Sequence, residues 1–248
     1  MAVYLLLPWL IFLSACAKTM VIEEPVYPMP EEIDTGYFTE RISYDALTSF
    51  SADIRVRAHS TDKLSGNFKG VMNYRKPGNL SSALFGPLGV TVMKALLSNG
   101  RLDLLVPNED VIYRAPASLP LLFPDRSSLS KYSMYLEDRA DQYILNVFTA
   151  QDMGTELVAR YYFERSSLRN HIIEMFSNGD IIMSLNISKT GPKNIPASFS
   201  VHILEHRFDI EAVYIKVNDG VPDIAFIPLS ASSVRPLSSV LLNSAFGR

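Results

Sequence analysis

Hydrophobic and polar residues alternate along most of the chain. Between positions 50 and 58 every second residue is apolar, from Phe50 through Ile54 to Ala58, and Asp53 and Arg55 stand between them. A period of two places the apolar side chains on one face of a half-buried β-strand. The same pattern recurs in segments 67–75, 79–85, 90–97, 101–106, 111–115, 142–149, 156–164, 170–176, 180–188, 197–206 and 211–217.

Short turn sequences separate these segments. Pro-Gly, Asn-Gly or Asp-Gly pairs stand at positions 77–78, 99–100, 178–179 and 219–220. Such pairs form the tight turns that join antiparallel neighbours. We therefore expect a mainly β protein, an antiparallel meander of about 11–12 strands that closes toward a barrel.

Two segments depart from the alternation. Near-helical spacing predicts a short helix that packs on the sheet, and its apolar residues are Tyr37, Phe38, Ile42, Ala46 and Leu47. Prolines at 116, 120 and 124 exclude a central strand between 115 and 135. We expect a loop there with one short helix near 127–135. This apolar loop either covers an open end of the barrel or simply packs on the core.

The N-terminal segment carries a targeting signal. An apolar run from Val3 to Leu13 is too short to span a bilayer, which takes ~20 residues, but it has the length of a secretory signal core. It ends in Leu-Ser-Ala-Cys, which resembles the bacterial lipobox. That resemblance implies a lipoprotein signal peptide at 1–15 and a diacylglycerol on the sulfur of Cys16, which anchors the chain in outer-membrane lipid. The alternative is a signal peptide that contains a cysteine by coincidence, and no Lys or Arg precedes the apolar run.

The residues after Cys16 suggest where the mature chain goes. Ala17 follows the cysteine, and the lipoprotein resemblance implies that a residue other than Asp there favours the periplasmic face of the outer membrane. Proline and acidic residues dominate 16–36, which predicts an extended, flexible tether. Segment 37–217 then forms the barrel, and 218–248 is a C-terminal extension with room for one more strand.

Composition and motifs exclude several functions. The net charge of −3 argues against a nucleic-acid partner. No nucleotide-binding loop, nucleophile elbow or metalloprotease motif is present. His202 and His206 would lie ~13 Å apart in a strand, too far to bind one metal ion. We therefore expect no catalytic residues, no cofactor and no metal, and a protein that is not an enzyme.

One turn is unusually apolar. Pro87, Leu88 and Gly89 join two predicted strands, and a bulky leucine stands where turns normally carry polar residues. An exposed leucine at this place calls for a hydrophobic partner, a membrane, or burial under another element.

These residues resemble a known family. Gly70-Val-Met-Asn-Tyr74, Lys76-Pro77-Gly78, Phe85-Gly-Pro-Leu-Gly89 and Asn99-Gly100 are similar to the LolB family of outer-membrane lipoprotein receptors, which share their fold with the LolA carriers. The resemblance implies an open antiparallel barrel around a hydrophobic cavity, with short helices as a lid. It implies a receptor that accepts lipoproteins from a LolA-like periplasmic carrier and inserts them into the outer membrane, with Pro87, Leu88 and Gly89 as the membrane-insertion loop.

A cavity of this kind binds acyl chains such as palmitate by burial alone, at about 0.8 kcal/mol per methylene. Inward residues of the predicted strands are the candidates that line it: Ile54, Val56, Met72, Tyr74, Val92, Phe148 and Tyr162. The plain alternative for each is the barrel core. Two other functions remain open: a lipoprotein of the same fold that binds another lipid or glycolipid, and a ligand-free structural or assembly lipoprotein of the envelope.

Overall fold

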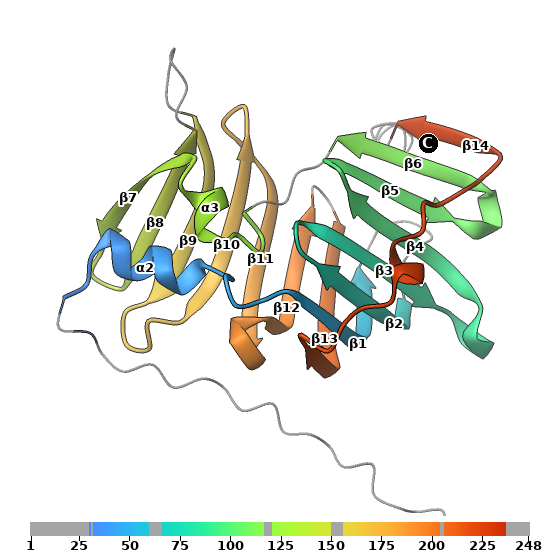
Figure 1. Ribbon diagram of the computed structural model, residues 1–248, viewed down its shortest axis with the longest axis horizontal. Coiled ribbons are helices and arrows are strands. Elements are labelled where there is room, and N and C mark those ends of the chain that lie inside the picture. Colours follow the sequence, from blue (N-terminus) through green and yellow to red (C-terminus); the bar gives the residue numbers. More distant parts are fainter. Residues whose placement is uncertain are drawn as a thin grey trace, which may run out of the picture.

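The chain folds into one open, curved sheet. The computed structural model describes residues 30, 32–59, 66–116, 121–149, 156–203 and 206–236. Fourteen strands pair in the order β14-β6-β5-β4-β3-β2-β1-β13-β12-β11-β10-β9-β8-β7, and the two outer strands do not pair with each other (Figure 1). The predicted mainly β, open barrel with short helices is confirmed.

The strands in chain order are β1 (Ser49–His59), β2 (Gly66–Arg75), β3 (Asn79–Phe85), β4 (Thr91–Ser98), β5 (Arg101–Val106), β6 (Val111–Pro116), β7 (Tyr132–Asp138), β8 (Gln142–Thr149), β9 (Leu157–Glu164), β10 (Asn170–Ser177), β11 (Asp180–Thr190), β12 (Pro196–Ile203), β13 (His206–Val217) and β14 (Ser233–Pro236). All neighbours are antiparallel except β14 and β6, which are parallel.

The register defines two faces of the sheet. Ile54 of β1 pairs with Gly70 of β2 and with Ala212 of β13. Paired residues point to the same side, so they share a face with the other buried residues of β1, which we call the inner face. Gly70 is required there, because a Cβ would lie 2.5 Å from the carbonyl oxygen of Ala83. The opposite, outer face carries exposed residues such as Arg55.

Two short helices cover part of the inner face. α2 (Thr35–Ile42) starts at Asp34, whose carboxylate accepts a hydrogen bond from the Tyr37 amide at 2.7 Å. α3 (Arg126–Leu129) is capped in the same way by Asp125. Figure 1 shows both helices against the half of the sheet formed by β7 to β11.

Both helices are shorter than the sequence predicted. α2 ends at Ile42, because Ser43 turns to an extended conformation, although Leu47 beyond it is still buried. α3 ends at Leu129, and residues 132–135, expected in a helix, belong to β7. Their alternating apolar side chains pair with β8 in register, and a β-period pattern of this kind favours the strand.

Two apolar clusters fill the inner side of the sheet. The first joins Phe38 and Leu129 of the helices, together with Leu121, to the inner residues of β8 to β12. The second lies on β1, β2, β3 and β13, and includes Leu47 and Phe50. On the half of the sheet formed by β7 to β11, the helices therefore cover the inner face by side-chain packing.

The C-terminal extension crosses the outer face. Asn218 accepts hydrogen bonds from the amides of Thr48 and Ser49 and ties the end of β13 to the start of β1. The 3₁₀ turn η5 (Asp223–Phe226) then lies against β3, where Asp223 pairs with Arg75. The chain continues to the edge strand β14.

The signal segment, Cys16 and most of the predicted tether lie outside the described residues. Among the helices that the structure describes, none has the length and hydropathy needed to cross a bilayer.

Candidate functional site

An exposed leucine marks the turn between β3 and β4. This turn, η2 (Pro87–Gly89), contains Leu88, whose side chain is 102% exposed and whose backbone is left-handed, with φ 62° and ψ 15°. Val90 beside it is also largely exposed. The left-handed conformation is strained for a leucine backbone, and exposure of the aliphatic side chain to water is unfavourable as well. Strained residues of this kind are common at functional sites.

Local geometry fixes this turn. The Gly86 amide donates to the Val90 carbonyl at 2.8 Å and closes the loop. Gly86 has no room for a side chain, because a Cβ would lie 2.9 Å from a methyl carbon of Val92. Gly89 has φ 76°, a conformation that glycine adopts without strain. The Leu88 side chain therefore projects from a rigid base.

A second turn has the same construction. η4 (Pro192–Asn194) also follows a glycine, places Lys193 in the left-handed region at φ 53°, and closes through a 2.8 Å bond from the Gly191 amide to the Ile195 carbonyl. β3 and β12 both run parallel to β1; η2 follows β3, and η4 precedes β12. The two turns therefore lie at opposite ends of the strands, one with an apolar tip and the other with a cationic tip.

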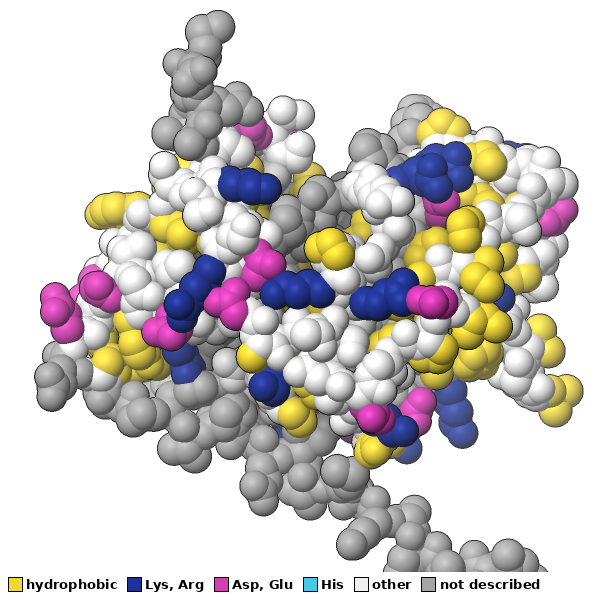
Figure 2. Space-filling view, in the orientation of Figure 1, with side chains coloured by type: hydrophobic (Ala, Val, Ile, Leu, Met, Phe, Trp, Pro, Cys, Tyr) yellow, Lys and Arg dark blue, Asp and Glu magenta, His cyan; other side chains and the backbone are white. Residues whose placement is uncertain are grey.

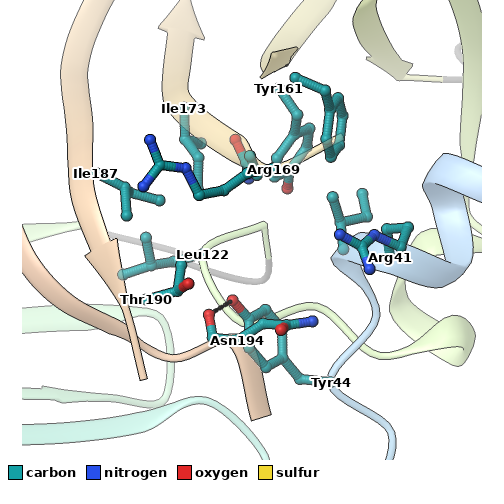
Figure 3. Close-up of a pocket in the computed structure, with 12 residues that line it drawn as sticks. Arg41, Tyr44, Leu122, Tyr161, Arg169, Ile173, Ile187, Thr190 and Asn194 are labelled. Atoms are coloured by element: carbon teal, nitrogen blue, oxygen red, sulfur yellow. Dashed lines mark hydrogen bonds between the residues drawn. The ribbon is translucent and has the colours of Figure 1, made fainter. Parts of the chain in front are cut away.

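A small pocket opens between α2 and the sheet, at the end where η4 lies. Its volume is about 20 Å³, room for about one water molecule. Arg41 comes from α2, Arg169 from the turn before β10, and Thr190 from the end of β11 (Figure 3). The remaining lining residues are Ile42, Tyr44, Leu122, Tyr161, Phe163, Asn170, Ile173, Ile187 and Asn194.

The charged groups of the pocket are held in place by hydrogen bonds. Arg41 donates to the Leu168 carbonyl at 3.1 Å. Arg169 donates to a Glu164 carboxylate oxygen at 2.7 Å and to the Ser188 carbonyl at 3.1 Å. The Arg169 guanidinium, through this hydrogen bond, lowers the pKa of Glu164, which therefore stays ionised.

Two buried oxygens at the pocket have no hydrogen-bond partner among the described residues. These are the Thr190 hydroxyl and the Asn170 side-chain carbonyl. Thr190 is 5% exposed. Buried polar atoms are nearly always paired, so each such atom calls for an explanation.

Hydrogen bonds and ion pairs fasten α2 and the segment around α3, which together form the cover of the pocket. The Tyr44 hydroxyl donates to the Asn194 carbonyl at 3.0 Å (Figure 3), and the Tyr161 hydroxyl donates to the Leu121 carbonyl. Complete burial raises the pKa of Tyr161 well above its usual range, so this hydroxyl keeps its proton. Arg126 bridges Glu40 and Asp45 at the surface.

The predicted cavity residues divide between the two faces. Ile54, Val56, Met72 and Tyr74 lie on the inner face and belong to or contact the second apolar cluster. Tyr74 stacks on Phe50, with ring centroids 5.5 Å apart. Val92 sits at the irregular start of β4 and packs on the same cluster. In this structure these side chains pack into the second apolar cluster, and of the five only Val56 also lines a groove that the structure describes, the wider one over β1, β2, β12 and β13.

Phe148 and Tyr162 are on the outer face, so assigning them to the cavity was wrong. Their neighbours Val147 and Tyr161 are the fully buried inner residues. The Tyr162 hydroxyl instead donates to Glu174 at 2.6 Å on the outside. For Phe148, alternation gave no clear answer because β8 carries apolar residues on both faces: Ile144, on the same face as Phe148, is 2% exposed. In β9 the pattern itself indicated the outer face for Tyr162, because Arg160 and Glu164 share its side of the strand.

A wider groove of about 590 Å³ lies over β1, β2, β12 and β13. Charged outer-face residues such as Arg55, Arg57, Lys69 and Arg207 line it together with apolar residues of the inner face, Val56, Phe68, Phe199 and Ile210. Arg55 pairs with Glu211 at 3.6 Å and Arg207 with Asp209 at 2.8 Å. The first pair joins β1 to β13 and the second lies within β13, and exposed charge pairs of this kind are ordinary on a solvated sheet. Within the described ranges, no cluster of three or more His, Cys, Asp or Glu residues could hold a metal ion.

Sequence reasoning identified the Leu88 turn but missed the pocket. Arg41, Arg169 and Thr190 carry no motif, and they meet only because α2, the turn before β10 and the end of β11 converge. Hydrophobic side chains gather on the opposite half of the molecule, over β3 to β6 (Figure 2).

Comparison with known proteins relates this architecture to solved structures. No protein-family model matches the sequence, and no curated protein is significantly similar to it. A LolA superfamily protein from Nitrosomonas europaea is 13% identical, with 79% of this chain and 99% of that chain covered and a TM-score of 0.53. A domain from Vibrio parahaemolyticus, described as an outer membrane lipoprotein-sorting protein, is 10% identical, with 78% and 95% covered and a TM-score of 0.54. At these identities the likeness concerns the fold.

Proposed function

The chain has the LolA/LolB-like fold that its sequence resemblance predicted, and from this premise we propose that it is a lipid-anchored envelope protein that binds acyl chains and passes them to a membrane. The bound acyl chains would lie between the inner face of the sheet and α2. In the full form of this proposal, the protein accepts lipoproteins from a LolA-like carrier and inserts them into the outer membrane, as LolB receptors do.

The observation that carries the proposal is Leu88. Its side chain is fully exposed on a rigid, left-handed turn. Exposure of a bulky aliphatic side chain to water is unfavourable, and its transfer from water into hydrocarbon lowers the free energy. Such a tip is suited to dip into a bilayer and bring the barrel against the membrane.

The anchor and the cargo complete the proposal. A lipid on Cys16 would hold the protein at the periplasmic face of the outer membrane, and the segment before α2 would let the barrel reorient. No catalytic step is needed, because each buried methylene contributes about 0.8 kcal/mol whether protein or bilayer buries it. Cargo would then pass by partition between two apolar environments.

Binding requires the cover to move. The pocket under α2 has about 20 Å³, which is far less than one acyl chain occupies. Phe38, Leu121 and Leu129 fill the space next to the sheet. An entering chain would therefore displace α2 and the segment around α3, which hydrogen bonds and surface ion pairs hold down.

A transfer assay tests the proposal. Purified protein is mixed with a LolA-like carrier loaded with a labelled lipoprotein, and then with outer-membrane lipid vesicles. We expect the wild type to take up the label and deliver it to vesicles. Leu88→Glu should still take up cargo but should lose most of the delivery, because a charged tip is expensive to place in hydrocarbon.

The η4 turn, which has the same construction as η2, supplies the matched control. Lys193→Glu places the same new side chain on the same backbone geometry at the opposite end of the strands. It should deliver cargo at the wild-type rate. Normal delivery by Leu88→Glu would contradict the insertion role, and a folded wild type that takes up no lipoprotein would exclude the receptor role.

A second candidate function is favoured by the polar side of the pocket. A protein of the same fold that carries another lipid would explain guanidinium groups beside the apolar interior. Mass spectrometry of lipids extracted from the purified protein separates the two. Recovery of a free lipid favours this candidate, whereas recovery of peptide-linked acyl chains favours the receptor.

A further inference from the structure

The pocket under α2 has a polar side that acyl chains alone do not require. Ile42, Ile173 and Ile187 form apolar lining, while Arg41 and Arg169 stand on two sides of the opening (Figure 3). Hydrocarbon gains nothing from guanidinium groups, whose planar donors fit carboxylate and phosphate oxygens. The lining therefore suits a molecule with one apolar part and one anionic part.

Thr190 gives independent support for a ligand. Its side chain is 5% exposed, lines the pocket and leaves its hydroxyl without a hydrogen-bond partner. A buried hydroxyl without a partner destabilises the fold, and valine has the same shape without this penalty. A hydroxyl kept at such a site is explained if it donates to a ligand oxygen.

We propose that this pocket is the headgroup subsite for an anionic acyl amphiphile, with Arg41, Arg169 and Thr190 around its carboxylate or phosphate. The proposal rests on the acyl-chain binding proposed above and names the class of lipid. It does not depend on delivery through Leu88.

The strand topology indicates the direction in which the acyl tail of the amphiphile would run. The pocket lies where β9 and β11 end, and the turn of Leu88 lies at the opposite end of the strands. Between them the inner face is apolar, through the clusters around Phe38 and Phe50. With its headgroup at the pocket, the amphiphile would therefore extend its acyl tail along the inner face toward the Leu88 turn.

Displacement of a neutral apolar dye from the purified chain tests the subsite. The competitors are palmitate, hexadecyl phosphate, hexadecanol and inorganic phosphate. We expect both charged amphiphiles to displace the dye at about tenfold lower concentration than hexadecanol, which corresponds to one added charge-assisted contact. Comparison of the two charged headgroups identifies which anion the site prefers, and inorganic phosphate alone should displace no dye.

Thr190→Val is the decisive variant. It should raise the melting temperature, because an unpaired buried hydroxyl is removed, and it should reduce the preference for palmitate over hexadecanol by about threefold or more. Thr190→Ser should restore the preference. Arg55→Gln, which removes an exposed arginine from the outer face, should leave it unchanged.

The outcomes separate the two proposals. If hexadecanol displaces the dye as well as palmitate does, the headgroup subsite is wrong and acyl-chain binding stands. If none of the amphiphiles displaces the dye, acyl-chain binding itself fails. A Thr190→Val protein with a higher melting temperature and an unchanged preference would assign Thr190 a structural role only and overturn the subsite.

Discussion

At the residue scale, Leu88 and Lys193 show that the same backbone geometry presents an apolar side chain at one turn and a cationic side chain at the other. Each residue stands at the left-handed position of a Gly-Pro turn, and each turn closes through a bond of the same length. The left-handed conformation costs an ordinary L-residue roughly 1–2 kcal/mol. Each of these two turns therefore maintains an unfavourable backbone conformation, and at Leu88 the chain adds an exposed aliphatic side chain.

The strain at Leu88 predicts a stabilising substitution. Asparagine tolerates the left-handed region better than leucine, and no burial is lost because Leu88 is fully exposed. Leu88→Asn should raise the free energy of unfolding by about 1 kcal/mol in a denaturant titration, while it weakens vesicle binding. Val90→Asn changes an exposed apolar neighbour with φ −69° and should give no such gain. Equal stability of Leu88→Asn and wild type would argue against strain.

Asp209 predicts a pH dependence. Hydrogen bonds from Ser200, Arg207 and His59 lower its pKa from 3.8 to about 2. The folded state thus favours the ionised carboxylate, and this stabilisation is complete above the unfolded pKa and is lost as the pH falls toward 2. Asp209→Asn should be less stable than wild type at pH 7, and the difference should shrink between pH 4 and pH 2.

A matched control separates this effect from general acid sensitivity. Asp53→Asn removes an exposed carboxylate from the same face of the neighbouring strand. It should change stability little at either pH. A difference between Asp209→Asn and wild type that stays constant down to pH 2 would assign the effect to packing instead.

At the element scale, α2 acts as a cover. Its Phe38 ring lies 4.3 Å from the ring of Phe163 and 5.2 Å from that of Tyr143, measured between centroids. The helix has eight residues, too few for stability in isolation. Tertiary packing, together with the N-terminal cap at Asp34, therefore holds α2 in place on the sheet.

Truncation of Phe38 should open the cover. Phe38 is 0% exposed, and loss of a buried phenylalanine destabilises a protein by about 3–5 kcal/mol. Phe38→Ala should lower the free energy of unfolding by this amount and should increase binding of an apolar dye. Tyr135→Ala, at an exposed position of β7, should change stability by less than about 0.5 kcal/mol. Unchanged dye binding by a folded Phe38→Ala protein would argue against α2 as the cover.

At the scale of the whole molecule, the open sheet separates the two features on which the proposals rest. The pocket with its guanidinium groups lies at one end of the strands, and the apolar turn lies at the other. The same sheet connects them through a continuous apolar inner face. Under the proposed function, this separation would let the protein hold a ligand at one end while the other end contacts a membrane.

The sequence by itself determined the local features. Alternation predicted the strand with Ile54 and Val56 and its inner face, and turn residues predicted the antiparallel meander. Pro87, Leu88 and Gly89 predicted an apolar turn, with burial of Leu88 under another element left open. Each of these depends on a period or a backbone preference that a few neighbouring residues set. The helix near Phe38 was predicted on the same basis, although its end was not.

Only the tertiary structure decided the rest. β8 carries apolar residues on both faces, so periodicity could not tell that Val147 points inward and Phe148 outward. The pocket brings together Arg41, Arg169 and Thr190 from three distant segments, and no local pattern carries that convergence. The interior is filled because α2 and the segment around α3 pack onto the sheet. Long-range packing decides which faces are buried and which polar groups meet, and a local sequence pattern does not contain it.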